Sequence, residues 1–405
     1  MAEETFMSKE FENMGTALAG TIAVEVSGHV AGPYCGSLLG DLGCEVIKVE
    51  LPGEGDTHRG RNPKYEGYSP SFRALNRNKK SLTLNLREEE AKRILHRLLE
   101  KADILIENIR AKTRTSFGLD YEQLCRLNPR LIHCSITGYG QSGPYRDKPG
   151  FDTIAQALSG MLSLVSDREK PQVVGVSVAD HSTGMFATYG ILAALLARHR
   201  TGRGQFVDAS LLQVSLAFIE SHIADYLNGG EGVSRENFPR GRIFCFIAGD
   251  QRPFVVHLSA HQDSWEGLVN VTERKDLLAD PRFATRRDRW EHHYEIHPIL
   301  QEEFRKKPRA AWLKALDANG VANAPIQTVE EVFKDPQIKH LGIPREIRHE
   351  KFGSSTLVGS PVKLSDTPTR FIRPAPLLGE NTEEILTRLG YDKEAIRGLR
   401  DRGVT

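Results

Sequence analysis

Thr21-Ile-Ala-Val-Glu-Val26 and Cys44-Glu-Val-Ile-Lys-Val49 frame the part of the sequence that decides the fold. Both segments are short, apolar and rich in β-branched residues, which is typical of strands. Between them, Pro33 favours the start of a helix, apolar positions in 34–42 continue it, and Gly43 ends it. A strand, a helix and a strand in this order form a right-handed unit with parallel strands. The segment therefore predicts an α/β fold with a parallel, doubly wound sheet.

The same alternation continues along the chain. Further strands are predicted at 81–86, 103–106, 131–136 and 205–210, and further helices at 87–101, 121–127, 152–164 and 211–227. Asn108-Ile-Arg110 comes directly after one of these strands. Because open α/β sheets bind ligands beyond the carboxyl ends of their strands, we expect the site at that edge.

Two features suggest a dinucleotide-binding site, but the neighbouring sequence that such a site requires is missing in both cases. Glu50 ends the second strand, where an acid often contacts a ribose, but the first turn lacks the glycine spacing. Gly138-Tyr-Gly-Gln-Ser-Gly143 has that spacing, but 144–149 contains two prolines and no apolar helix. We interpret this segment as a mobile active-site loop.

Basic residues collect in the polar loop 52–71. They are His58, Arg59, Arg61 and Lys64. They form either a solvated surface or a rim that receives phosphates through charge-assisted hydrogen bonds.

Composition excludes several classes of protein. With 54 Lys and Arg against 53 Asp and Glu, the net charge is +1, so no global field favours nucleic acid or an acidic membrane. No apolar run is long enough to span a bilayer, and 1–13 is too polar and acidic for a signal peptide. The five scattered cysteines predict buried free thiols in a reducing compartment. We expect a cytoplasmic protein without nucleic-acid or membrane partners.

The length of 405 residues permits more than one domain. A polar segment rich in glycine and charge, 229–241, marks a boundary. We predict a large domain in 1–228, a small domain in 229–345, and a C-terminal segment, 346–405, that returns to the large domain or packs on a partner subunit. In the small domain, His293 and His297 lie one helical turn apart, but no third ligand is near, so we expect a solvated polar face and no metal site.

Asp180 lies at the joint between two apolar segments. The first, 173–178, predicts a strand, and the second, 185–196, predicts a helix that must be buried because it is apolar almost all round. A carboxylate at such a joint either caps the helix by accepting a free backbone N–H group or serves as a nucleophile at the mouth of a rigid core. Local sequence leaves both interpretations open.

Together, many segments resemble the class III CoA-transferase family (CaiB/BaiF), which includes formyl-CoA:oxalate and carnitine CoA-transferases. The resemblance covers almost the whole chain in the family's order. The matching segments are Val30-Ala-Gly-Pro33, Gly43-Cys-Glu-Val-Ile-Lys-Val-Glu50, Gly55-Asp56 with Arg59, Asn76-Arg-Asn-Lys-Lys-Ser81, Leu84-Asn85, Glu107-Asn-Ile-Arg110, Asn128-Pro-Arg-Leu-Ile132, Ser135-Ile-Thr-Gly-Tyr-Gly-Gln-Ser-Gly-Pro144, Ala179-Asp180 with Thr183-Gly184, Thr201-Gly-Arg-Gly-Gln205 and Pro376-Leu-Leu-Gly379.

The resemblance implies the fold, the assembly and the site. It implies a Rossmann-like large domain, a smaller α+β domain and a homodimer of interlocked rings. It assigns Asp180 as the catalytic aspartate, which passes the helix cap to Ser182 or Thr183, and it implies no metal or redox cofactor. Coenzyme A, as acyl-CoA substrate, would contact His29, Val30, Ala31, Leu84, Asn85, Arg87, Asn108, Ile109, Arg110, Lys148, Gly150, Phe151 and Asp152.

The implied activity is transfer of CoA to a small carboxylic acid through aspartyl anhydride and aspartyl-CoA intermediates. Related acyl-CoA racemases carry a histidine where this chain has Phe151, and the oxalate branch carries a glycine-rich lid that Gly249-Asp-Gln-Arg-Pro253 does not match. The loop from Ser135 to Pro144 is more similar to the branch that uses succinyl-CoA and dicarboxylates. A racemase and a non-catalytic CoA-binding protein are the alternatives.

Overall fold

The computed structural model describes residues 6–12, 15–62, 69–173, 175–230, 232, 242–259, 261–351 and 353–405. The chain divides into two compact units, Met1–Glu231 with Gly342–Thr405 and Gly232–Leu341. The predicted boundaries were after residues 228 and 345. Assigning the units to a CoA-binding domain and a small domain stays a prediction.

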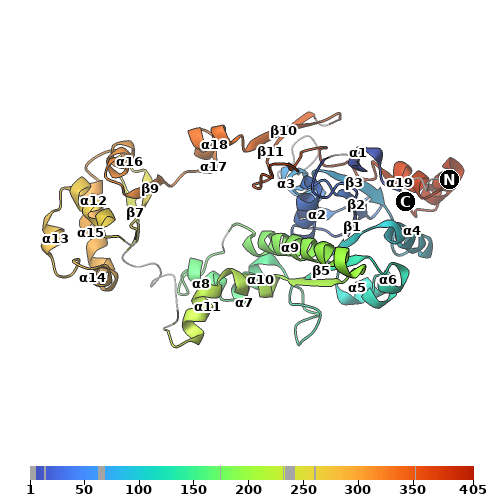
Figure 1. Ribbon diagram of the computed structural model, residues 1–405, viewed down its shortest axis with the longest axis horizontal. Helices are drawn as coiled ribbons and strands as arrows, with labels where there is room; N and C mark the ends of the chain where they lie inside the picture. The colour runs from blue at the N-terminus through green and yellow to red at the C-terminus, as the bar shows by residue number, and fades with distance from the viewer. Residues whose placement is uncertain are drawn as a thin grey trace. The chain divides into compact units, whose positions relative to one another are not determined.

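A six-stranded sheet organises the first unit (Figure 1). Its order is β3-β2-β1-β4-β5-β6, and each neighbouring pair is parallel. The strands are β1 (Ile22–Val26), β2 (Glu45–Glu50), β3 (Lys79–Thr83), β4 (Ile104–Glu107), β5 (Ile132–Thr137) and β6 (Phe206–Ser210). The chain adds strands on one side of β1 and then on the other, so β1 and β4 meet at a switch point where such sheets bind ligands. The predicted parallel, doubly wound sheet is confirmed.

Helices cover both faces of the sheet because successive side chains of each strand point to opposite faces. On one face, Ala23 packs with α2 (Ala31–Asp41) and α9 (Val178–Thr201). On the other face, Val24 packs with α4 (Glu89–Lys101) and with the C-terminal helices α19 (Thr382–Arg388) and α20 (Lys393–Asp401). The C-terminal segment thus contributes to the core of the first unit.

The other elements of the first unit are short. They are α1 (Lys9–Glu12), η1 (Thr57–Gly60), α3 (Pro70–Leu75), α5 (Ala111–Ser116), α6 (Tyr121–Leu127), α7 (Asp152–Leu158), α8 (Met161–Val165), α10 (Leu211–Phe218), α11 (Glu220–Leu227) and the antiparallel pair β10 (Pro344–His349) and β11 (Gly353–Val358). The helix predicted at 152–164 is divided in two where Gly160 takes a left-handed conformation. No helix follows Gly143 until α7, which agrees with rejecting a dinucleotide fingerprint there.

The second unit is α+β. Its antiparallel sheet has the order β7-β8-β9. The strands are β7 (Ile243–Ile247), β8 (Pro253–His257) and β9 (Ala322–Pro325), and the helices are α12 (Asp263–Thr272), α13 (Asp276–Ala279), α14 (Arg286–Glu291), α15 (His293–Phe304), α16 (Arg309–Ala318), α17 (Val329–Val332) and α18 (Pro336–Leu341). Aromatic side chains, including Trp265 and Phe304, fill its core.

One prediction around Asp180 is wrong, and a second is met only in part within the single chain. Residues 171–173 and 175–177 form no strand, and α9 begins at Val178. Val176 is 64% exposed, and none of the described strands lies beside this segment to form backbone hydrogen bonds with it. The helix predicted at 185–196 is present within α9 but is buried on one side only, since Tyr189 and Leu196 are 70% and 68% exposed. The other side of this apolar helix is exposed in the single chain.

Two predictions from composition can be compared with the structure. Cys35, Cys44 and Cys134 are buried free thiols as expected, but Cys125 is only partly buried and Cys245 is exposed. Within the part of the chain that the structure describes, no helix is both long enough and apolar enough to cross a bilayer.

Candidate active site

A cavity of about 730 Å³ opens at the carboxyl ends of the strands in the first unit. Its walls come from the segments that follow β1, β4 and β5 and from the starts of α7 and α9. Most of the predicted site residues lie together on its lining, namely His29, Val30, Ala31, Asn108, Ile109, Arg110, Lys148, Gly150, Phe151, Asp152 and Asp180. They come from distant parts of the chain.

Leu84, Asn85 and Arg87 do not line this cavity. Leu84 is buried in the core, and the Asn85 backbone N–H donates to the carbonyl of Val404 at 2.8 Å. The Asn85 side chain accepts from the backbone N–H of Arg87 at 3.3 Å. A contact of these residues with CoA stays a prediction.

The switch point of the sheet is held by a reciprocal pair of hydrogen bonds. The Gly28 backbone N–H donates to Asn108 Oδ1 at 3.0 Å, and Asn108 Nδ2 donates to the Gly28 carbonyl at 2.8 Å. His29, the next residue, has a left-handed φ of 65°, which is unfavourable for a residue other than glycine. The loops after β1 and β4 are therefore fixed to each other where the cavity begins.

Asp180 lies in the first turn of α9 and is not its cap. The cap position is Ser177, which makes no side-chain capping bond. The Asp180 backbone N–H instead donates to Asp152 Oδ1 at 3.0 Å. A carboxylate 28 residues away in sequence thus satisfies one free N–H group of the helix.

The prediction that Ser182 or Thr183 caps the helix is wrong. Both hydroxyls donate to carbonyls one turn earlier, at Val178 and Ala179. Hydroxyl groups inside a helix commonly bond to the carbonyl four residues before them, and this bond competes with capping.

The electrostatic environment of Asp180 is that of a perturbed carboxyl group. Burial, and next the negative charge of Asp152, raise the pKa of Asp180 to about 7. The Asp152 carboxylate is fixed by Gln156, whose Nε2 donates to it at 2.6 Å. Two acids therefore lie side by side, and Asp180 changes protonation near neutral pH. A titratable group with a strongly shifted pKa in a cavity is a candidate functional group.

Basic side chains outnumber these two acids on the cavity lining. They are His29, His58, Arg61, Arg110, Arg146 and Lys148. Burial lowers the pKa of His58, so His58 adds little positive charge at neutral pH, while Arg61, Arg110, Arg146 and Lys148 remain charged. The cavity can therefore receive a ligand with several negative charges, such as phosphate groups.

Sequence reasoning assigned no individual site role to Arg61, His58 or Arg146. Loop 52–71 was noted only as basic, and of its cations His58 and Arg61 line the cavity. Arg59 instead forms a buried bidentate pair with Glu50 at 2.6 and 2.7 Å. Lys64 lies outside the described residues. Glu50 is paired with Arg59 and does not line the cavity, which agrees with discounting it as a ribose contact.

The loop after β5 is held by side-chain hydrogen bonds and by a close contact between two glycines. Gln141, on the cavity lining, accepts from Arg114 Nη1 at 2.6 Å and donates to Ser135 Oγ at 2.8 Å. Gly138 and Gly150 approach so closely that a Cβ on Gly150 would lie 2.5 Å from the Gly138 Cα. The predicted mobile loop is thus tied at both ends.

No group of three or more His, Cys, Asp or Glu side chains suited to a metal ion occurs among the described residues. The prediction of a solvated polar face for His293 and His297 holds only in part, because both side chains are partly exposed and also pack on aromatic rings. The rings of His293 and His297 stack on Phe244 and Phe246, and His297 Nε2 bonds to the Cys245 carbonyl at 2.9 Å.

Comparison with known proteins gives the family. The model of CoA-transferase family III matches residues 18–382. The succinate–glutarate CoA-transferase of Agrobacterium fabrum is 34% identical over 94% of this chain and 97% of its own length. The human succinyl-CoA:glutarate CoA-transferase is 33% identical over 96% of this chain and 89% of its own. A crystal structure of a CaiB/BaiF family protein from Brucella suis has a TM-score of 0.82 and 33% identity, covering 92% of this chain and 99% of that one. The chain therefore belongs to CoA-transferase family III.

Proposed function

We propose that the chain moves CoA from an acyl-CoA donor to a small carboxylic acid and that Asp180 is the nucleophile. Family membership supports CoA transfer in general. One observation carries the role of Asp180. Its carboxylate lies on a cavity with six basic side chains, yet no described residue donates a hydrogen bond to it or forms an ion pair with it. A structural carboxylate in such surroundings would be paired.

The proposed reaction follows from the chemistry of a carboxylate and a thioester. An Asp180 oxygen attacks the thioester carbonyl, the carbon–sulfur bond breaks, and CoA leaves as a thiolate, which gives a mixed anhydride. The thiolate then attacks the aspartyl carbonyl, so the donor acid leaves as a carboxylate and an aspartyl-CoA thioester remains. An acceptor carboxylate repeats these steps in reverse and restores Asp180. Protons balance without an added acid or base.

Three features of the site support these steps. The amino-terminal turn of α9 carries partial positive charge, which stabilises the ionised form of Asp180. Arg110, Arg146 and Lys148 supply charge for the phosphates of CoA. Backbone N–H groups in the glycine-containing loop 138–150 are the donors that we expect at the tetrahedral oxyanion. Exclusion of water from this cavity would protect the anhydride.

The substrate class that we propose is a dicarboxylic acid, with succinyl-CoA as donor. The names of the two relatives refer to succinate and glutarate. A second carboxylate on donor or acceptor would find a partner among the arginines of the cavity.

An exchange assay tests this proposal. We expect isotope-labelled succinate or glutarate to enter the acyl-CoA pool when the protein is incubated with succinyl-CoA. Monocarboxylates of equal length are the matched controls and should exchange more slowly. Absence of exchange with every acid tested would contradict transfer, while wash-in of deuterium at the α-carbon of a branched acyl-CoA would favour the racemase alternative.

We propose further that the protein is a homodimer of interlocked subunits. Large apolar side chains on α7, α9, α10 and α11 are open in the single chain, namely Ile154, Leu158, Met185, Phe186, Tyr189, Leu196, Leu216, Phe218, Tyr226 and Leu227. So many large apolar side chains exposed on four helices are normally covered in solution. Light scattering after size-exclusion chromatography should give twice the chain mass of 45.2 kDa, and a monomer would contradict the assembly.

A further inference from the structure

Asp56 lies directly behind two loops of the cavity. It follows β2, and its side chain is almost fully buried. Asp56 Oδ1 accepts the backbone N–H of His58 at 2.9 Å and that of His29 at 3.4 Å. Both histidines line the cavity, one after β1 and the other after β2. A single carboxylate therefore connects two loops that belong to different strands.

The other Asp56 oxygen faces a buried lysine. Lys48 Nζ lies 3.0 Å from Asp56 Oδ2 and 2.9 Å from Glu25 Oε1, and it also donates to the Ser27 carbonyl at 2.7 Å. Ser27 starts the segment that leads to His29. Lys48 thus holds the same loop that Asp56 holds, at a point two residues earlier.

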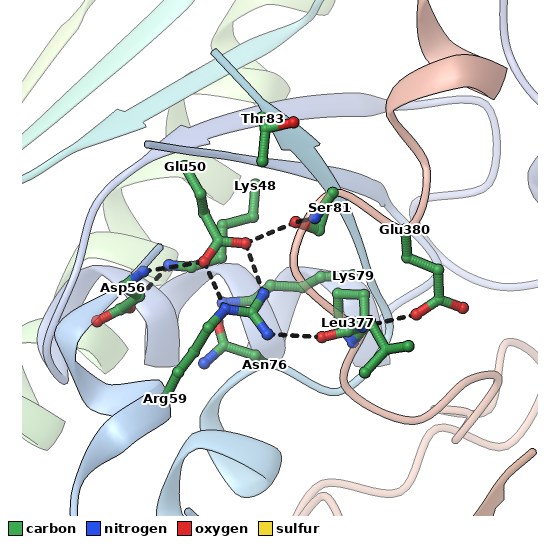
Figure 2. Close-up of polar contacts among 12 residues, drawn as sticks. Lys48, Glu50, Asp56, Arg59, Asn76, Lys79, Ser81, Thr83, Leu377 and Glu380 are labelled. Atoms are coloured by element: carbon green, nitrogen blue, oxygen red, sulfur yellow. Dashed lines mark hydrogen bonds and ion pairs between the residues drawn. The ribbon is translucent and has the colours of Figure 1, made fainter. Parts of the chain in front are cut away.

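The backbone of Asp56 is fixed as well (Figure 2). Its N–H donates to Glu50 Oε1 at 3.1 Å, and Glu50 is held by the Arg59 guanidinium and by Ser81 Oγ at 2.6 Å. Arg59 Nη1 donates to the Pro376 carbonyl at 2.9 Å, which links the cluster to the C-terminal segment. Side chain and main chain of Asp56 therefore have little freedom.

This cluster is balanced in charge and buried. Its acids are Glu25, Glu50 and Asp56, and its bases are Lys48, Arg59 and Lys79. Ionic groups buried in this way gain little stability over apolar side chains of the same size, because their desolvation is costly. These groups instead fix the positions of the backbone at Ser27, His29 and His58. The strained backbone of His29, with its positive φ, requires such support.

We propose that Asp56 is a positioning residue for acyl-CoA, because its carboxylate fixes the loops that present His29 and His58 to the cavity. The identity of the ligand, acyl-CoA, rests on the proposed function. The positioning of the two loops by Asp56 does not depend on it. Asp56 acts through the two loops and does not contact the reacting atoms. Burial would raise the pKa of Asp56, but Lys48 and the two N–H groups hold it below its ordinary value, so the group stays ionised at neutral pH.

The variant Asp56→Asn tests this role. Asparagine has one acceptor oxygen and one amide group, so it can serve either the two backbone N–H groups or Lys48, but not both. We expect KM for acyl-CoA to rise about tenfold while kcat stays within about threefold, as for a loss of ground-state binding. Amide hydrogen exchange in 27–31 and 56–61 should become faster by about tenfold or more.

The matched control is Asp41→Asn. Asp41 is equally buried, pairs with Arg77 at 2.6 and 2.9 Å and accepts from Asn78 at 2.9 Å, but does not line the cavity. This variant should leave KM and the exchange of both loops unchanged, and the Tm of both variants is measured alongside to separate loop positioning from general stability. If Asp56→Asn does not fold, Asp56→Glu serves instead, because it keeps a negative charge beside Lys48 while the longer side chain moves the carboxylate away from the two backbone N–H groups.

The outcomes separate this inference from the proposed function. A raised KM with faster exchange in the two loops, absent in Asp41→Asn, supports positioning by Asp56. An unchanged KM with protected loops overturns it, and so does an equal rise of KM in both single variants. If the wild-type protein transfers no CoA, the proposed function fails, and amide exchange alone decides whether Asp56 fixes the loops.

Discussion

Replacement of Asp180 by Ala or Asn should abolish CoA transfer, with a loss in kcat on the order of 10⁴-fold or more. The reason is that both proposed covalent intermediates are formed on this side chain. Asp180→Asn is the stricter variant because it keeps the size of the side chain. Transfer rates measured with succinyl-CoA and a dicarboxylate give the result directly.

Binding and folding should survive this change. The raised pKa of Asp180 means that the folded protein disfavours its charged form, so a neutral asparagine removes a penalty at a pH above about 7. We therefore expect an unchanged or higher Tm and an unchanged Kd for CoA. A large fall in Tm would instead indicate a structural role, and retention of full activity would exclude Asp180 as the nucleophile.

The second large effect should be that of pH. Only the ionised carboxylate attacks, and the pKa of Asp180 is about 7, so kcat/KM should fall about tenfold for each pH unit below it. Between the plateau above about pH 8 and pH 5 the loss should approach a hundredfold. The measurement is a pH profile of kcat/KM, with Kd of CoA determined at the same values to separate binding from chemistry.

Asp152→Asn provides the internal test of this profile. It removes the negative charge that contributes to the raised pKa of Asp180 and keeps an oxygen that can accept the Asp180 backbone N–H. The midpoint of the profile should therefore move to lower pH. Asp41→Asn, which changes a buried acid away from the cavity, should leave the midpoint in place. A wild-type profile that is flat between about pH 5 and pH 8 would contradict the assignment.

The sheet was predictable from sequence because its strands are buried on both faces. Apolar β-branched segments such as the one in β1 alternate with helical segments, and this order alone requires parallel strands. The strand predicted at 173–178 is absent because the same pattern was applied where none of the described strands is a neighbour that could pair with it. An apolar, β-rich segment predicts a strand only if a neighbouring strand is available, and neighbours are set by tertiary structure.

The site was predictable only in part. Asp180, His29 and Asn108 follow from the family resemblance and from their places after predicted strands. The role of Asp152 in accepting the Asp180 N–H was not predictable, because no local pattern relates residues 28 positions apart. The contribution of Arg61 was missed for a different reason. A charged loop residue has the same local pattern whether it faces solvent or a cavity.

The central claim is that CoA becomes covalently attached to Asp180, and peptide mass spectrometry tests it most directly. The protein is incubated with succinyl-CoA without acceptor, quenched in acid and digested, with Asp180→Asn treated in parallel. We predict a CoA adduct on the peptide that contains Asp180, lost when a dicarboxylate is added and absent from the variant. An adduct on another residue, or transfer that proceeds with an unmodified Asp180 peptide, would contradict the claim.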